Sequence, residues 1–146
     1  TNNPPFDYHR VNMTNYMNLT AQSPRNRFAE ELELSPYAQG MGAVGLPGDA
    51  SSASRFVRAA FMKWNSAAPA EEQASVAQFF HILDSVAMIR GAVVTEQGTF
   101  DITTYSCCMN GRTGVYYYKT YDNSHLRTMD MHQENLDGDV LIIKAV

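Results

Sequence analysis

The sequence contains little cysteine, and its cysteines are not arranged for cross-linking. Only two occur, at the adjacent positions Cys107 and Cys108. A small secreted domain held together by disulfides needs several cysteines spread along the chain, so this class of protein is excluded. Both cysteines fall in a segment that we expect to be a β-strand, where neighbouring side chains point to opposite faces. We therefore expect two free thiols rather than a reactive pair.

Clustered positive charge and long apolar runs are also missing. The 146 residues carry 11 Lys and Arg against 15 Asp and Glu, which gives a net charge of −4. The basic residues are scattered and form no stripe, which excludes a protein that binds nucleic acid by neutralising its phosphates. No run approaches the ~20 apolar residues of a membrane-spanning helix. With 45% hydrophobic residues, the sequence is typical of a globular domain or of part of one.

The sequence indicates no metal site and no dinucleotide site. Four histidines occur: His9, His81, His125 and His132. Their spacing is not that of zinc ligands. Residues 40–45 read Gly-Met-Gly-Ala-Val-Gly, which matches a dinucleotide fingerprint letter for letter. That fingerprint requires a strand before it and a helix that opens directly from it, whereas Pro36 precedes these residues and Pro47-Gly48 follows them. We expect a flexible glycine loop here and no cofactor.

Helical signals dominate the first two thirds of the chain. Residues 6–19 show a loose helical spacing of apolar side chains after Pro4-Pro5. Residues 20–48 carry mostly loop signals, because they are rich in proline and glycine. A stronger amphipathic pattern predicts a helix over residues 52–65, preceded by side chains that can cap it. Another helix is predicted to start near residue 71 and to end near Arg90-Gly91.

The last third of the chain changes to the alternation of β-strands. We predict strands over residues 100–108, 115–121, 126–131 and 140–144, with an additional edge strand over 92–95. Asn110-Gly111 and Asp122-Asn123 are typical turn dipeptides between them. Helices that are followed by consecutive strands predict an α+β fold, in which the helices pack on an antiparallel sheet.

Two polar residues are open to more than one interpretation. Arg55 lies in the first turn of the helix predicted over 52–65, where a positive charge opposes the helix dipole by about 0.3–1 kcal/mol. It is either a solvated surface side chain, which its position alone favours, or a fixed cation held over a polar site. Asn2, just before Asn3-Pro4-Pro5, is either a turn residue or an amide directed at a reacting group.

Three blocks of this sequence resemble the choloylglycine hydrolase family. Residues 1–9 read Thr-Asn-Asn-Pro-Pro-Phe-Asp-Tyr-His, residues 45–58 end in Ser-Arg-Phe-Val-Arg, and residues 116–122 read Tyr-Tyr-Tyr-Lys-Thr-Tyr-Asp. The blocks follow the family order and span essentially the whole chain. The family fold is a four-layer αββα sandwich of the N-terminal-nucleophile hydrolases. The resemblance implies that residues 1–146 form the C-terminal portion of one such domain.

The same resemblance implies the hydrolysis of a linear, non-peptide C–N amide. In the family, an N-terminal cysteine supplies both the thiol nucleophile and an α-amine that titrates near ~7.7–8.0 and acts as the base. Asn2 matches the Asn of the family motif Thr-Asn-x-Pro, and Arg55 matches the Arg of Ser-Arg-Phe-Val-Arg. Both are thereby implied to be catalytic-site residues beside the thiol. The expected substrate is a conjugated bile salt, cleaved to release glycine or taurine, and penicillin V is the alternative.

The chain departs from the family because it lacks the nucleophile. It opens at Thr1 without an initiator Met, and Cys107 and Cys108 are not at a chain start. We therefore expect the 146-residue chain alone to be inactive and to need the remainder of the domain. A non-catalytic assembly module is the competing hypothesis. The resemblance further implies a cytoplasmic bacterial protein, a homotetramer, no cofactor, and subunit contacts through the loop of residues 20–48.

Overall fold

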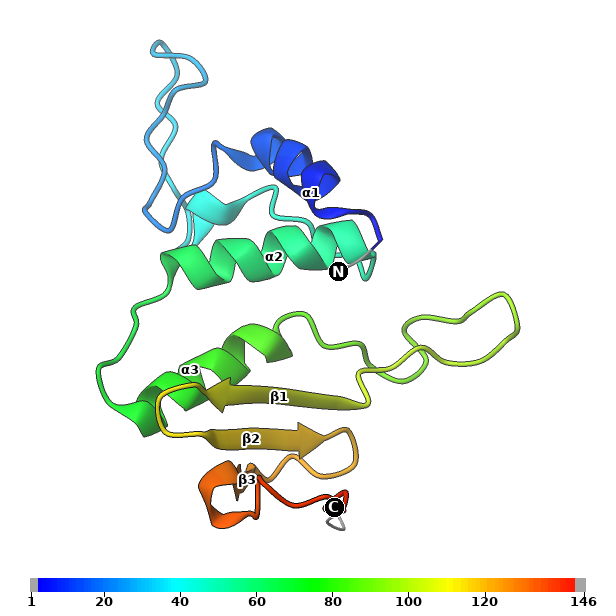
Figure 1. Cartoon of the computed structure of the whole chain (residues 1–146). Coiled ribbons are helices and arrows are strands. Elements are labelled where there is room, and N and C mark those ends of the chain that lie inside the picture. Colours follow the sequence, from blue (N-terminus) through cyan, green and yellow to red (C-terminus); the bar gives the residue numbers. More distant parts are fainter. Residues whose placement is uncertain (1–2, 144–146) are drawn as a thin grey trace.

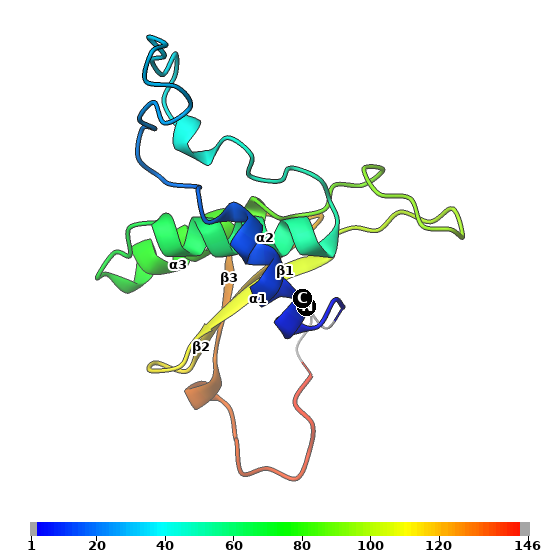
Figure 2. The same cartoon turned by 90° about the horizontal axis from the view of Figure 1, so that it is seen from above.

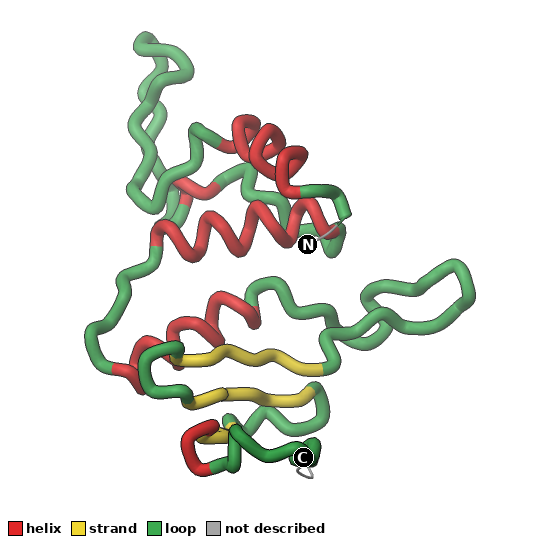
Figure 3. The backbone as a smooth tube through the Cα atoms, in the orientation of Figure 1, coloured by secondary structure: helices red, strands yellow, loops and turns green. Residues whose placement is uncertain are grey.

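The structure, a computed structural model, describes residues 3–143 and consists of three helices, a small sheet and long loops (Figure 1). The helices are α1 (Phe6–Asn12), α2 (Ser52–Asn65) and α3 (Glu72–Asp84), and short 3₁₀ turns cover Met13–Tyr16, Met41–Ala43 and Met131–Gln133. The strands are β1 (Tyr105–Asn110), β2 (Val115–Thr120) and β3 (Arg127–Asp130). Long loops join α1 to α2 and α3 to β1 (Figure 3). No helix in the described part of the chain is both long and apolar enough to cross a membrane.

The sheet is an antiparallel meander in the order β1-β2-β3, and α3 packs on one of its faces. Because Cys108 pairs with Tyr117, these two residues lie on the same face. Lys119, two residues further along β2, places its Nζ atom 2.7 Å from the Asp84 carboxylate and 5.4 Å from the centre of the Phe80 ring. The predicted α+β class, with helices packed on an antiparallel sheet, is confirmed.

The other face of the sheet keeps much of its apolar area in contact with solvent. The alternation of side chains and the strand register place Tyr105, Met109, Tyr116 and Tyr118 on this face. Tyr105 and Met109 are each 60% exposed. The rings of Tyr116 and Tyr118 lie side by side, with their centres 5.9 Å apart. A sheet face this rich in aromatic residues is typical of a surface that packs against another layer.

The buried apolar core of the described residues is small. It consists of four side chains that are at most 8% exposed: Val57, Val76, Phe80 and Met88. One is on α2, two are on α3 and one follows α3, so the core is centred on α3, which contacts α2 and β1. α2 contacts both α1 and α3, and α1 runs across α2 when the molecule is seen from above (Figure 2).

The helix over residues 52–65 has the predicted limits, but the other two helices are shorter than the sequence suggested. Thr14 donates its hydroxyl to the carbonyl of Val11 (2.7 Å), and the chain tightens into a 3₁₀ turn after α1. α3 ends at Asp84 rather than near Arg90. There the hydroxyl of Ser85 donates to the carbonyl of Ile82 (2.6 Å), which competes with continuation of the helix.

Two of the predicted strands are not present as strands. Residues 140–143 form no strand, and Lys144 lies outside the described residues. Of residues 92–95, only Val94 forms a bridge, which pairs it with Phe100. Both segments have the aliphatic residues that favour β-structure, but within residues 3–143 neither has a neighbouring strand that pairs with it along its length.

The glycine-rich segment is a loop, as predicted. Its middle forms the 3₁₀ turn Met41–Ala43, and Gly40 has a φ of 79°, in the left-handed region that favours glycine. The backbone N–H of Thr20 donates to the carbonyl of Gly42 (3.0 Å). A Cβ atom on Gly42 would collide with the carbonyl oxygens of Thr20 and Gln22. Gly42 is thus required for a close approach of two loop segments.

A carboxylate fastens the start of α3 to the sheet. The Oε1 atom of Glu72 accepts hydrogen bonds from the hydroxyls of Tyr117 (2.8 Å) and Thr113 (3.2 Å). The bond from Tyr117 is the main reason why the pKa of Glu72 lies below its ordinary value of 4.5. The same bond raises the pKa of Tyr117 above its ordinary value of 10.0. The ionised carboxylate and the neutral phenol are therefore both favoured in the folded state.

We expect this contact to make folding stability depend on pH in the acid range. Because the folded pKa of Glu72 is depressed, its contribution is complete above the unfolded value of 4.5 and is lost as the pH falls through the folded value. Glu72→Gln should lower the urea midpoint near neutral pH and flatten its decline below about pH 4.5. The matched control is Glu71→Gln, at the neighbouring exposed carboxylate. Equal acid slopes for Glu72→Gln and the unmodified chain would contradict the assignment.

Candidate functional site

The two segments that carry the predicted site residues lie against each other. Ser52, in the first turn of α2, donates its hydroxyl to the carbonyl of Asn3 (2.9 Å). The His9 ring of α1 stacks on Phe56 of α2, with ring centres 4.1 Å apart and an angle of 16° between the planes. His9 is completely buried. Asn2 lies outside the described residues, but its neighbour Asn3 is thus fixed at the start of the helix that carries Arg55.

α2 begins where it does because two side chains accept hydrogen bonds from backbone N–H groups at its start. Ser51 is the N-cap, and its Oγ accepts from the backbone N–H of Ser54 (3.3 Å). Asp49 accepts through Oδ1 from the backbone N–H of Ser51 (2.9 Å) and through Oδ2 from the hydroxyl of Ser54 (2.5 Å). The side-chain hydroxyl of Ser51 is the largest cause that lowers the pKa of Asp49 to about 2, followed by the hydroxyl of Ser54 and the backbone N–H of Ser51. The carboxylate is consequently ionised near neutral pH.

Arg58, one turn further along α2, holds the preceding loop against the end of α3. Its Nη1 atom donates to the carbonyls of Pro47 (2.7 Å) and Asp49 (3.2 Å), and its Nε donates to the carbonyl of Ser85 (2.9 Å). All three acceptors lie outside α2. The sequence pattern did not single out Arg58, because carbonyls of distant loops leave no trace in a helical periodicity.

Arg55 lies along the chain between Ser51 and Arg58, whose side chains are held by the hydrogen bonds described above. Among the described residues, the Arg55 side chain lacks such a bond at its Nε atom. Its Nε atom is buried and makes no hydrogen bond with any of the residues 3–143. At its Nε atom, this half-buried side chain is therefore not the freely solvated surface group that position alone favoured. Leaving a buried polar group without a partner costs free energy, and such a group calls for a specific explanation. Its neighbours have structural roles: Ser54 binds Asp49, and Val57 is core.

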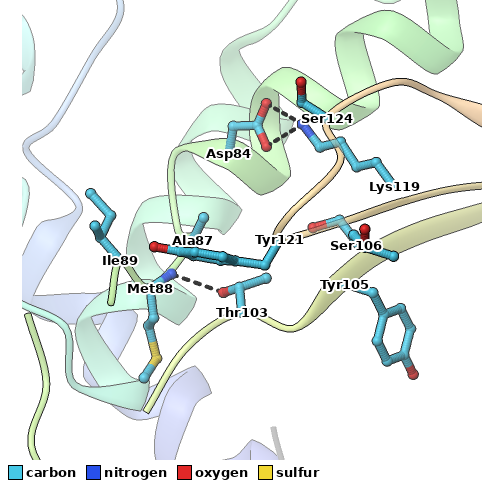
Figure 4. Close-up of a pocket in the computed structure, with 11 residues that line it drawn as sticks. Asp84, Ala87, Met88, Ile89, Thr103, Tyr105, Ser106, Lys119, Tyr121 and Ser124 are labelled. Carbon is cyan, nitrogen blue, oxygen red and sulfur yellow. Dashed lines mark hydrogen bonds and ion pairs between the residues drawn. The ribbon is translucent and has the colours of Figure 1, made fainter. Parts of the chain in front are cut away.

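A separate pocket of about 160 Å³ lies where the end of α3 meets β1 and β2 (Figure 4). The two charged groups that line it, Asp84 and Lys119, pair with each other at 2.7 Å. The hydroxyl of Thr103 accepts from the backbone N–H of Met88 (2.8 Å). These groups thus satisfy one another: the ion pair joins α3 to β2, and the Met88–Thr103 bond joins the two ends of the 85–104 loop. Arg55 does not line this pocket.

Neither the thiols nor the acidic residues of the described chain form a second site. Cys107 and Cys108 are free, as predicted. Desolvation, with a smaller effect of the neighbouring Cys107, raises the pKa of the Cys108 thiol above its ordinary value of 9.0, which disfavours the nucleophilic thiolate. Across residues 3–143, no group of three or more His, Cys, Asp or Glu side chains could hold a metal ion.

Comparison with known proteins gives one consistent family. A sequence model described as linear amide C–N hydrolases, choloylglycine hydrolase family, matches residues 1–144. The chain is 49% identical over 142 residues to a bile salt hydrolase/transferase of Lactiplantibacillus plantarum, covering 97% of this chain and 44% of that protein. It is 41% identical over 140 residues to a protein of the same description from Clostridium perfringens, covering 95% and 42%.

Solved structures give the same result for the fold. A variant of the conjugated bile acid hydrolase from Clostridium perfringens superimposes with a TM-score of 0.79 at 40% identity, over 94% of this chain and 42% of that one. A penicillin V acylase from Agrobacterium tumefaciens superimposes with a TM-score of 0.61 at 20% identity, over 91% and 36%, which shows a shared fold only. The chain spans less than half the length of the relatives it matches.

Proposed function

Because the chain belongs to the choloylglycine hydrolase family, we propose that it is part of an enzyme that hydrolyses conjugated bile salts at their amide bond. The two relatives described above, at 49% and 41% identity, are bile salt hydrolase/transferases, which supports a bile salt as substrate. Penicillin V is the alternative substrate, and the acylase compared above is only 20% identical. The products would be the free bile acid and glycine or taurine.

The observation that carries this proposal is the buried, unpartnered Nε atom of Arg55 within residues 3–143. In the proposed enzyme, Arg55 lies beside the thiol of an N-terminal cysteine contributed by the part of the domain that this chain lacks. A cation about 4 Å from a thiolate lowers its free energy by about 4 kcal/mol at an effective dielectric of ~20. The thiolate is the nucleophilic form of cysteine, so this charge favours attack on the amide carbonyl.

The reaction then proceeds by acyl transfer. The thiolate attacks the amide carbonyl, and the α-amine of the same cysteine carries the proton to the leaving glycine or taurine nitrogen. Water then attacks the thioester, releases the bile acid and restores the thiol. We assign Asn2 to the same site, close to the nucleophile and its amine. The support for Asn2 is its match to the family motif and the fixed position of Asn3 at the start of α2.

We propose that the rest of the domain covers the apolar surfaces of this chain. One of these surfaces is the sheet face that carries Tyr105 and Met109. Another is an apolar groove of about 570 Å³ between α1, α2 and α3, lined among others by Phe56, Trp64 and Phe79. A second sheet on the open face would complete the four-layer αββα sandwich. Residues 1–146 alone, without the nucleophile, would then be inactive.

The long loop before α2 suits subunit contacts. It stands away from the helices (Figures 1 and 2), and its side chains Phe28 and Tyr37 are 85% and 88% exposed. We assign these residues to an interface of a homotetramer in the bacterial cytoplasm, as large exposed aromatic residues are typical of interfaces. Light scattering of the full-length protein tests the assembly: a tetrameric mass is expected, and a monomer would contradict it.

The test of the proposed function is a substrate comparison with the full-length protein. We expect glycine release from glycocholate to exceed the hydrolysis of penicillin V at equal substrate concentration. If penicillin V is hydrolysed faster than glycocholate, penicillin V replaces the bile salt as the proposed substrate. Hydrolysis of neither substrate by a folded protein would contradict the enzymatic proposal and favour the non-catalytic assembly module.

A further inference from the structure

The first turn of α2 is held more firmly than the start of a helix requires. The Ser51 cap already satisfies the backbone N–H of Ser54. Asp49 adds two further bonds through its carboxylate, to the backbone of Ser51 and to the side chain of Ser54. Its own carbonyl accepts from Arg58 (3.2 Å). Asp49 thus connects the loop before the helix to residues on both sides of Arg55.

The carboxylate of Asp49 does not neutralise Arg55. Its two oxygens accept from Ser51 and Ser54, and no ion pair between Asp49 and Arg55 occurs in the described part of the chain. An acidic residue this near would otherwise be the natural partner of the arginine. The negative charge of Asp49 interacts favourably with the positive end of the helix dipole at the start of α2. Because its carboxylate oxygens bind Ser51 and Ser54, the guanidinium of Arg55 stays available to another group.

We propose that Asp49 is a positioning residue, which fixes the backbone of the first turn of α2 and thereby the direction in which Arg55 projects. The inference rests on the proposed catalytic role of Arg55. The backbone N–H of Arg55 donates to the carbonyl of Ser51 (3.0 Å), and the side chain of the preceding residue, Ser54, is tied to Asp49. A shift of this turn would therefore move the guanidinium relative to the nucleophile.

The experiment uses four single variants and one double variant of the full-length protein. Asp49→Ala removes both carboxylate bonds. Asp49→Asn keeps the geometry, because the amide can accept from Ser51 and donate to the Ser54 oxygen. Arg55→Ala is combined with Asp49→Ala, and Asp101→Ala at an exposed loop carboxylate is the matched control. The readouts are kcat and KM for glycocholate and the melting temperature.

We expect Asp49→Ala to lower kcat about tenfold with KM changed less than about twofold, since small misplacements of a catalytic group act on the chemical step. Asp49→Asn should recover most of kcat, and Asp101→Ala should leave it unchanged. In the Arg55→Ala background, Asp49→Ala should cost nothing further.

If Asp49→Ala lowers kcat by the same factor in the unmodified protein and in the Arg55→Ala variant, Asp49 does not act through Arg55. The positioning role is then overturned, while the catalytic role of Arg55 is unaffected. A lowered melting temperature with unchanged kcat would also overturn it, because Asp49 would then serve stability alone. If Arg55→Ala itself leaves kcat unchanged, the proposed function of Arg55 fails instead, so the two failures are distinguishable.

Discussion

Replacement of Arg55 by alanine in the full-length protein should lower kcat for glycocholate by about 10²- to 10³-fold. The effect follows from the charge, since up to about 4 kcal/mol of thiolate stabilisation is removed and each 1.36 kcal/mol corresponds to about a factor of ten. Folding should be little affected, because the Arg55 Nε atom makes no hydrogen bond within residues 3–143 whose loss would destabilise the protein. The measurement is steady-state glycine release, together with a thermal melt.

Two matched variants separate the charge from the shape of the side chain. Arg55→Lys keeps a positive charge but not the planar fork, and it should retain part of kcat. Arg10→Ala removes an exposed arginine of α1 and should leave kcat unchanged. Near-normal turnover of a folded Arg55→Ala variant would count against its assigned role.

Replacement of Phe80 by alanine should lower the free energy of unfolding of the 146-residue chain by about 3–5 kcal/mol. Phe80 is only 6% exposed, and it is one of four buried apolar side chains among residues 3–143. The ring also lies under the ammonium of Lys119, which the Asp84 carboxylate holds in place. With so small a core, no other buried residues could compensate for the lost contacts, and typical domains are stable by only about 5–15 kcal/mol.

Urea unfolding followed by circular dichroism measures this loss. Phe28→Ala makes the same chemical change at a side chain that is 85% exposed, and it should alter the free energy by no more than about 0.5 kcal/mol. If the two variants unfold at the same urea concentration, Phe80 is not part of the core that holds α3 to the sheet.

The sequence predicted the fold best where local signals agreed with one another. α2 has the expected limits because a capping residue, Ser51, and an apolar stripe both mark its start. β1 and β2 occur as expected around Asn110-Gly111, although β1 begins only at Tyr105. The prediction of a strand over 140–144 was wrong for residues 140–143, because β-propensity does not supply a pairing partner.

The candidate site was predictable only in part. Arg55 was identified by its odd place in a first helical turn and by a family motif, but the burial of its Nε atom came from the structure. The roles of Arg58 and Asp49 depend on carbonyls and hydroxyls brought together by folding, at separations that no periodic pattern encodes. The assignment of Asn2 stays a prediction, because it lies outside the described residues.

The most direct test of this account is glycine release from glycocholate, measured in parallel for the full-length protein and for the 146-residue chain. We expect turnover by the full-length protein and none by the chain, since the chain contributes Arg55 but no N-terminal cysteine nucleophile. Turnover by the purified chain, or no turnover of either glycocholate or penicillin V by a folded full-length protein, would contradict the proposed function.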